Sequence, residues 1–340
     1  MNGTIHSVKE ASGDAPASIS VVVVTPNRFA NIRRTVRHMR AQTIRDRIEL
    51  VVVAPSGDAL ADAASHELDG FHSVRLLDIG QIRDVDKSAA DGVRHARAEV
   101  VGMIEDHAFA EPEWAEAMLA AHEGPWVAVA STMVNANPKR QLSWCNMLVA
   151  YGPSVEPTIE GERTAIPGHN VSFKRTALAP FGDALRDRFG REGGLLDALR
   201  ANGGRFLLCE RARVHHINPS TWAATAEVRI NAGRLYGASR AQAGSWSAVR
   251  RLLYSAAGPL IPFVRYSRVT QELFGAGRRA ELAKRVAPAV FGGLVLDAIG
   301  QMAGYAIGEG NSRQVLMHFE LDRMLHIPAD ERREFDEPHA

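Results

Sequence analysis

Two runs rich in aliphatic residues near the N-terminus constrain the fold more than any other feature, ISVVVVT at 19–25 and ELVVVA at 49–54. A strand buried on one face alternates apolar and polar side chains, and these runs do not alternate. They predict strands of a parallel sheet that helices cover on both faces. A helix is expected between them at 29–42, because Ile32 and Val36 recur at helical spacing.

Strand-like and helix-like segments continue to alternate along the first 130 residues. Further strands are expected at 74–78, 100–104 and 126–130, and further helices after the turn at 55–58, at 87–98 and at 112–121. This alternation is typical of βαβ units with right-handed crossovers. The predicted fold class is α/β, a Rossmann-like and mostly parallel sheet flanked by helices.

Composition narrows the class of protein. The 340 residues carry a formal charge of +1, and 46% are hydrophobic, which argues against disorder and against a nucleic-acid partner. The two cysteines, Cys145 and Cys209, cannot form a disulfide framework and match no zinc motif. Residues 1–18 lack the apolar core of a signal peptide. We therefore expect the chain to stay on the cytoplasmic side.

Three polar residues, Glu105, Asp106 and His107, directly follow the apolar strand expected at 100–104. The carboxyl ends of strands form the ligand crevice of an open parallel sheet. Carboxylates there suit Mg²⁺ or Mn²⁺, and an added imidazole favours Mn²⁺, through which a pyrophosphate could bind. The alternative interpretation is a polar strand exit that binds nothing.

Glu192 precedes a helix expected at 193–201. A glutamate at this position commonly serves only to interact with the helix dipole. The functional alternative is a general base that removes a proton from an acceptor hydroxyl.

Two adjacent histidines, His215 and His216, follow a strand-like segment at 211–214. Either imidazole could add a metal ligand or contact phosphate. In the alternative interpretation one ring packs in the core and the other hydrogen-bonds to a carbonyl group.

Five segments, in order, resemble the family 2 (GT-A fold) glycosyltransferases across roughly residues 18–220. Residues 19–28 are similar to the family's first strand and nucleotide-contacting turn, and 92–99 to the helix before its metal-motif strand. The residues Glu105, Asp106 and His107 stand where the family has its Asp-rich motif. Residues 168–175 resemble the acceptor-side Gly-x-Asn segment, and the dipeptide at 191–192 stands at the acidic pair that contains the base.

The resemblance implies inverting transfer of a sugar from a nucleotide diphosphosugar to a hydroxyl of a glycan or lipid-linked acceptor. It implies a role in cell-envelope or extracellular polysaccharide synthesis, and the Ala- and Arg-rich composition indicates a bacterial source. A Mn²⁺ or Mg²⁺ ion would stabilise the leaving diphosphate, and Glu192 would act as the catalytic base. The implied site residues are, for the donor, Thr25, Pro26, Asn27, Arg28, Asp58, Lys87, Glu105 and Asp106; on the acceptor side, Gly168, His169 and Asn170; and for the metal, Asp106, His107, His215 and His216.

Two segments depart from the family pattern. Where the family has an acidic pair that reads the nucleobase, residues 54–58 retain only Asp58, and Ala89 and Ala90 replace an Arg-Asn pair. These departures motivate an alternative function, a catalytically degenerate protein that binds sugar nucleotides as a scaffold. A nucleotidyltransferase is disfavoured because no Gly-rich phosphate loop follows the first strand.

Apolar and basic segments dominate the chain after residue 246. Residues 252–264 carry no charge but are too short to cross a bilayer. Residues 286–308 are long enough, yet Asp297 near their middle costs about 2.5 to 3.5 kcal/mol on insertion scales. Between 250 and 285, eight basic and two acidic residues favour an anionic leaflet. We expect surface or re-entrant membrane attachment, with a buried helical cap and a true span as alternatives.

The expected organisation has three parts. A GT-A glycosyltransferase domain occupies 18–240, and an apolar and basic helical region, membrane-associated on the cytoplasmic side of the inner membrane, occupies 246–310. A polar tail at 311–340 carries four basic and seven acidic residues, and we expect its end to be loose.

Overall fold

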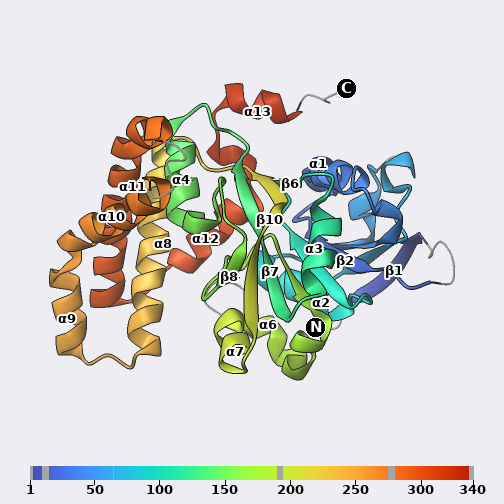
Figure 1. Cartoon of the computed structure of the whole chain (residues 1–340), viewed down its shortest axis with the longest axis horizontal. Helices are drawn as coiled ribbons and strands as arrows, with labels where there is room; N and C mark the ends of the chain where they lie inside the picture. Colours follow the sequence, from blue (N-terminus) through green and yellow to red (C-terminus); the bar gives the residue numbers. More distant parts are fainter. Residues whose placement is uncertain (1–2, 10–14, 64, 190–193, 275–279, 337–340) are drawn as a thin grey trace. The chain divides into compact units, whose positions relative to one another are not determined.

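The computed structural model describes residues 3–9, 15–63, 65–189, 194–274 and 280–336 (Figure 1). The chain forms two compact units. The first contains Met1–Val134 and Glu156–His216, and the second contains Asn135–Val155 and Ile217–Ala340.

A mixed sheet forms the centre of the first unit. Its strands are β1 (Thr4–Lys9), β2 (Ile19–Val24), β3 (Ile48–Ala54), β4 (Ser73–Asp78), β5 (Val100–Ile104), β6 (Ala108–Ala110), β7 (Trp126–Asn135), β8 (Gly161–Arg163), β9 (Val171–Lys174) and β10 (Arg205–His216). They lie in the order β1-β4-β3-β2-β5-β9-β7-β10-β6, with β8 paired to β10. Strands β4, β3, β2 and β5 are parallel, whereas β9 is antiparallel to both β5 and β7. The predicted parallel strands are therefore confirmed within a sheet that is mixed overall.

Helices of the first unit follow most of the predicted ranges. They are α1 (Phe29–Arg40), α2 (Val85–His95), α3 (Trp114–His122), α5 (Arg175–Leu178), α6 (Leu185–Arg188) and α7 (Leu195–Ala201). The prediction of a helix after the turn at 55–58 is wrong. That segment forms two short 3-10 turns, Gly57–Leu60 and Ser65–Leu68, because it is rich in Gly, Asp and Ser and has no apolar stripe to pack on the sheet.

The run predicted as apolar at 49–54 begins with a carboxylate that lies inside the protein. Glu49 is buried, and its Oε1 lies 3.0 Å from Nη1 of Arg75 on the neighbouring strand β4. Its Oε2 accepts hydrogen bonds from Ser20 Oγ at 2.5 Å and from the backbone N–H of Arg97 at 2.8 Å. The carboxylate of Glu49 therefore links β2, β3 and β4 near the amino ends of these parallel strands.

His122, the last residue of α3, gives the first unit a pH-dependent stability. Burial lowers the pKa of its imidazole to about 4. Between about pH 6.5 and pH 4 the unfolded chain binds a proton that the folded protein does not, so this contribution is complete above pH 6.5 and is lost on acidification. We expect about 3 kcal/mol to be lost between pH 7 and pH 4, measured by urea unfolding. The variant His122→Gln cannot take up this proton and should lose less, and equal losses in both proteins would contradict the assignment.

The second unit is helical. Its helices are α4 (Gln141–Tyr151), α8 (Trp222–Ala243), α9 (Ala248–Ala256), α10 (Ile261–Phe274), α11 (Ala280–Ile307), α12 (Ser312–Leu321) and α13 (Ala329–Asp336), with 3-10 turns at Gly152–Ser154, Gly258–Leu260 and Arg323–His326. Phe319 and Ile327 are buried, so the tail expected at 311–340 is folded as far as Asp336. The last four residues lie outside the described part of the chain.

Glycines bring α8 and α11 into backbone contact (Figure 1). A Cβ added at Gly300 would lie 2.0 Å from the carbonyl oxygen of Ile230, and one at Gly304 would lie 2.1 Å from that of Arg234. Only glycine permits helices to pack this closely. The polar centre of α11 lies inside this bundle, since Asp297 and Gln301 are both buried.

We expect Gly300→Ala to lower the free energy of unfolding of the second unit by about 1 to 3 kcal/mol, because the new methyl group forces the two backbones apart. Gly292→Ala is the matched control on the same helix. Its Cβ would meet only the ring of Trp222, at 3.9 Å, and alanine raises helix propensity. Urea unfolding should show opposite signs for the two variants, and similar destabilisation by both would contradict the packing argument.

One helix in the described part of the chain, Lys284–Ile307 within α11, is long and apolar enough to cross a membrane, with a mean hydropathy of 1.5. Half of its most apolar stretch is buried within the protein. Asp297 Oδ2 lies 2.5 Å from Arg265 Nη1 and accepts a hydrogen bond from Gln301 Nε2 at 2.6 Å. The carboxylate that was expected to oppose membrane insertion is thus neutralised by α10.

Candidate active site

Three potential metal ligands, Glu105, His107 and His216, meet where β5 and β10 end. Their nearest ligand atoms all lie within 4.8 Å of one another. The short strand β6 pairs antiparallel with the end of β10, with Ala108 opposite His216. This ladder brings together His107 and His216, which are 109 residues apart in the chain.

The two imidazoles face each other beside a carboxylate. His107 Nε2 and His216 Nε2 are 3.1 Å apart, and His216 Nε2 lies 3.4 Å from Glu105 Oε2. Both rings are almost completely buried. Two nitrogen atoms at this distance repel unless a proton or a cation lies between them. Two imidazoles and one carboxylate fit a transition-metal ion such as Mn²⁺ better than Mg²⁺, which prefers oxygen ligands.

Asp106 lies beside His107, outside the group of three ligands. Its Oδ1 lies 2.7 Å from Nδ1 of His107, and it is not one of the three grouped ligands. A proton on Nδ1 donated to this carboxylate leaves the lone pair of Nε2 directed at Glu105 and His216. Asp106 therefore orients the imidazole of His107.

The segment predicted on the acceptor side contacts Glu105. Asn170 Nδ2 donates a hydrogen bond to Glu105 Oε2 at 2.5 Å, while Asn170 Oδ1 accepts one from the backbone N–H of Glu105 at 3.1 Å. His169 Nδ1 lies 3.4 Å from Glu105 Oε1, and Gly168 precedes it in an open turn. Asn170 has a φ of 52°, a conformation that asparagine tolerates better than most residues.

Burial alone would raise the pKa of Glu105, but the neighbouring histidines outweigh it. His169, His107 and His216 together hold the pKa of this carboxyl well below its usual range. Glu105 is therefore ionised at neutral pH and is available as an anionic ligand.

Of the two adjacent histidines, His216 joins this group and His215 is separated from it. Successive residues of a strand point to opposite faces, so the ring of His215 points away from that of His216. Its Nε2 lies 2.9 Å from Glu111 Oε1, which also accepts a hydrogen bond from Arg213 Nε at 3.0 Å. Burial raises the pKa of Glu111, but its bonds to Arg213 and His215 lower it overall. No sequence pattern had identified Glu111.

The predicted donor-side residues follow the carboxyl ends of neighbouring strands. In the turn after β2, Thr25 Oγ1 donates a hydrogen bond to the carbonyl oxygen of Arg28 at 2.6 Å, and Pro26 and Asn27 lie between them. Asp58 is exposed in the turn after β3. Because β2 lies between β3 and β5, these turns lie at the same edge of the sheet as Glu105.

Two residues that sequence reasoning missed also lie at this edge. Thr35 Oγ1 of α1 donates a hydrogen bond to the carbonyl oxygen of Asp106 at 2.8 Å, which supports the loop that holds His107. Asp86 Oδ1, in the first turn of α2, lies 3.8 Å from His169 Nδ1. The neighbouring predicted residue Lys87 points instead to Asp187, 3.4 Å from its carboxylate.

Glu192, the predicted base, lies outside the described residues. The helix expected at 193–201 is present as α7, which begins at Leu195 after a left-handed Gly194.

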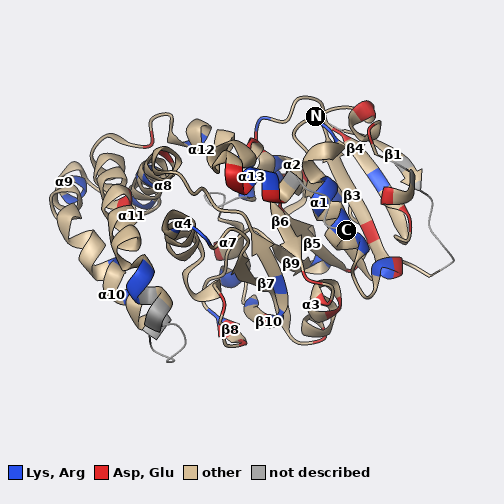
Figure 2. Cartoon of the chain, turned by 90° about the horizontal axis from the view of Figure 1, so that it is seen from above, with Lys and Arg blue, Asp and Glu red and all other residues tan. Residues whose placement is uncertain are grey.

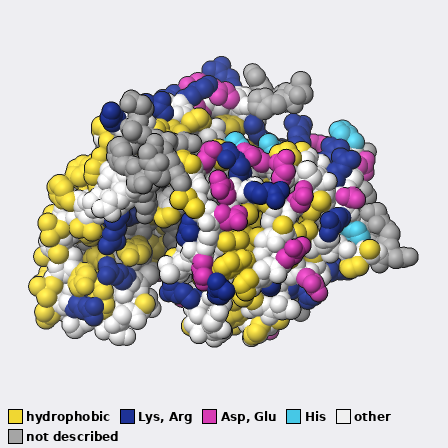
Figure 3. Space-filling view, viewed as in Figure 1, with side chains coloured by type: hydrophobic (Ala, Val, Ile, Leu, Met, Phe, Trp, Pro, Cys, Tyr) yellow, Lys and Arg dark blue, Asp and Glu magenta, His cyan; other side chains and the backbone are white. Residues whose placement is uncertain are grey.

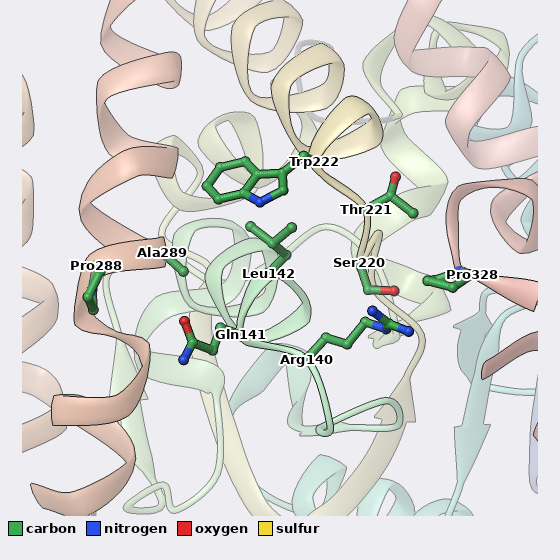
Figure 4. A pocket seen from close by; sticks show the side chains of 9 residues that line it. All are labelled: Arg140, Gln141, Leu142, Ser220, Thr221, Trp222, Pro288, Ala289 and Pro328. Atoms are coloured by element: carbon green, nitrogen blue, oxygen red, sulfur yellow. The ribbon is translucent and has the colours of Figure 1, made fainter. Parts of the chain in front are cut away.

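The second unit contains an open pocket of about 500 Å³ (Figure 4). Its walls are largely apolar and include Leu142, Trp222 and Pro288. Arg140 also lines it, but its guanidinium pairs with Asp330 at 2.8 Å and with Glu331 at 3.1 Å. The pocket therefore suits an apolar group better than an anion.

Comparison with known proteins gives three findings. Residues 20–180 match the family model described as Glycosyl transferase family 2. The chain is 32% identical over 222 residues to the Glucosyl-dolichyl phosphate glucuronosyltransferase of Haloferax volcanii, a match that covers 58% of this chain and 68% of that protein. It is also similar in structure to the mannosyltransferase PcManGT of Pyrobaculum calidifontis in complex with GDP-Man and Mn²⁺, with a TM-score of 0.51 and 16% identity over 87% of this chain and 90% of that one. The structural likeness shows the fold, a GT-A-like mixed sheet with flanking helices and a C-terminal helical region.

Proposed function

The chain belongs to glycosyl transferase family 2, and on this premise we propose that it transfers a sugar, with inversion, from a nucleotide diphosphosugar to a hydroxyl of a lipid-linked acceptor. The observation that carries the proposal is the buried group formed by Glu105, His107 and His216 at the carboxyl edge of the sheet. The Haloferax volcanii relative is by name a transferase for glucosyl-dolichyl phosphate, which supports a lipid-linked acceptor here. We place the reaction in the synthesis of cell-envelope or extracellular polysaccharide.

We propose that Glu105, His107 and His216 hold a Mn²⁺ ion. When bound, the ion would supply positive charge to the diphosphate leaving group. The protein prepares this site in advance, because Asp106 fixes the tautomer of His107 and Asn170 holds both the carboxylate and the backbone of Glu105. The structural neighbour that binds GDP-Man and Mn²⁺ supports the same donor class and metal.

The remaining roles follow from position at the edge of the sheet. The turn from Thr25 to Arg28 and the side chain of Asp58 would contact the nucleotide, and Lys87 would approach its phosphates. Glu192 would remove the proton of the acceptor hydroxyl as the sugar transfers, which makes it the catalytic base. His169, 3.4 Å from Glu105, would lie between the metal group and the acceptor.

We also propose that the protein works on the cytoplasmic side of the inner membrane, attached through residues 246–310. The long apolar helix and the lipid-linked acceptor both support attachment. The buried Asp297 and its ion pair with Arg265 favour a peripheral or re-entrant arrangement over a simple span.

Calorimetric titration with UDP-, GDP- and dTDP-sugars, each with and without Mn²⁺, tests the proposed function. We expect one nucleotide class to bind, and only with the metal. The variant Glu192→Gln should retain this binding and lose turnover with a lipid-linked acceptor. Donor binding without turnover in the unmodified protein would favour the degenerate scaffold, which the incomplete acidic pair at 54–58 motivates. No binding by folded protein would overturn the proposal.

A further inference from the structure

Helix α9 has its polarity reversed relative to an ordinary surface helix. Two of its polar side chains point inward, where Arg251 Nε donates to the carbonyl oxygen of Tyr305 at 2.7 Å and Ser255 Oγ donates to that of Met302 at 3.0 Å. Its aliphatic side chains point outward, and Leu252 is 69% exposed. A helix in water buries its apolar face. This arrangement therefore indicates that the outer face of α9 contacts an environment less polar than water.

The following turn and α10 repeat the pattern. The guanidinium of Arg265 points inward to Asp297, while Phe263 on the same helix is 62% exposed and Leu260 in the preceding turn is 65% exposed. We call this outward surface the α9–α10 face; it consists of Val249, Leu252, Leu253, Leu260, Phe263 and Val264. Figure 3 shows hydrophobic side chains gathered over α9 and α10.

Basic residues outnumber acidic ones on these two helices. Residues 246–274 include four arginines and one acidic residue, Glu272 near the end of α10. Arg250 and Arg268 are exposed on these helices, and the guanidinium of Arg250 lies over the ring of Trp246, 4.5 Å from its centre. Figure 2 shows basic residues on both α9 and α10. Long basic side chains can lie along an apolar surface and extend their charge to phosphate groups.

We propose that the α9–α10 face docks in the interfacial layer of an anionic bilayer, with its apolar side chains among the upper acyl carbons and Arg250 and Arg268 at the lipid phosphates. The inference deepens the membrane attachment proposed above and rests on it. Helices of 9 and 14 residues are too short to cross the hydrocarbon core, so they lie in the plane of the interface. Contact with the membrane is thus assigned to α9 and α10, while α11 supports them from within the bundle.

Sedimentation of the full chain with phosphatidylcholine vesicles, with and without phosphatidylglycerol, tests this inference. We expect binding to the anionic vesicles and little to the neutral ones. Leu253→Glu and Phe263→Glu should each weaken binding at least about tenfold, since each removes an inserted apolar side chain. Arg250→Gln and Arg268→Gln should each weaken it about fivefold at low salt.

Leu325→Glu is the matched control, because Leu325 and Leu253 are both 64% exposed and both belong to the second unit, but Leu325 lies outside the α9–α10 face. It should bind vesicles like the unmodified protein. Equal effects of Leu253→Glu and Leu325→Glu, or no binding to anionic vesicles, would overturn the inference. So would a dimer that Leu253→Glu dissociates in the absence of vesicles, since the face would then bind a second copy. Titration of the same variants with nucleotide sugars tests the proposed function separately. Loss of vesicle binding with donor binding retained concerns this inference alone, whereas loss of donor binding concerns the proposed function.

Discussion

We expect the replacement of His216 with alanine to lower the proposed metal-dependent sugar transfer roughly a thousandfold, because a proposed ligand nitrogen is lost and with it about 4 kcal/mol of stabilisation of the leaving diphosphate. Donor binding should lose its response to Mn²⁺ at the same time. Turnover at several Mn²⁺ concentrations, together with calorimetric titration of the donor, measures both effects.

The adjacent histidine provides the control. His215→Ala removes an imidazole of the same kind one residue away, but that ring bonds to Glu111 on the opposite face of β10. We expect its dependence on Mn²⁺ to match that of the unmodified protein. Circular dichroism establishes that both variants are folded. If the two alanine variants lose activity equally, or if folded His216→Ala keeps its response to Mn²⁺, the proposed metal site is wrong.

Glu49→Ala should lower the free energy of unfolding by about 3 to 5 kcal/mol, because it removes the carboxylate that pairs with the buried guanidinium of Arg75 and leaves that cation the carbonyl oxygen of His95. It also removes the acceptor for Ser20 and for the backbone N–H of Arg97. Urea and thermal unfolding of the purified chain measure the loss.

Two further variants separate charge from hydrogen bonding at this position. Glu49→Gln keeps an acceptor oxygen but not the charge, so its loss should be intermediate. Glu99→Ala removes an exposed carboxylate and should change stability by about 0.5 kcal/mol or less. Stability of Glu49→Ala close to that of the Glu99→Ala control would mean that this buried ion pair contributes little net free energy.

The candidate site was only partly predictable. Glu105 and His107 could be identified because they directly follow an apolar strand, and the ends of parallel strands form a ligand crevice. The choice between His215 and His216 could not be made, because it depends on which face of β10 lies on the same side as the side chains of Glu105 and His107. Asn170 and Thr35 act through contacts that span 65 and 71 residues of sequence, and no local pattern reports such contacts.

The C-terminal helices were also only partly predictable from the sequence. Hydropathy identified residues 286–308 as long and apolar, but hydropathy does not distinguish a bundle core from a membrane span. The contacts of Gly300 with α8 and of Asp297 with Arg265 show that the middle of α11 packs inside the second unit. The outward position of Leu252 and Phe263 likewise depends on how α9 and α10 pack against α11.

By itself the sequence determined the parallel strands β2, β3 and β5 and the polar cluster that follows one of them, because hydrophobic periodicity and strand ends are local properties of the chain. The tertiary structure alone decided the antiparallel insertion of β9, the edge strand β1 and the pairing of His107 with His216. It also decided which helix faces meet solvent. These features depend on contacts between residues far apart in the chain, and such contacts form only when the whole fold closes.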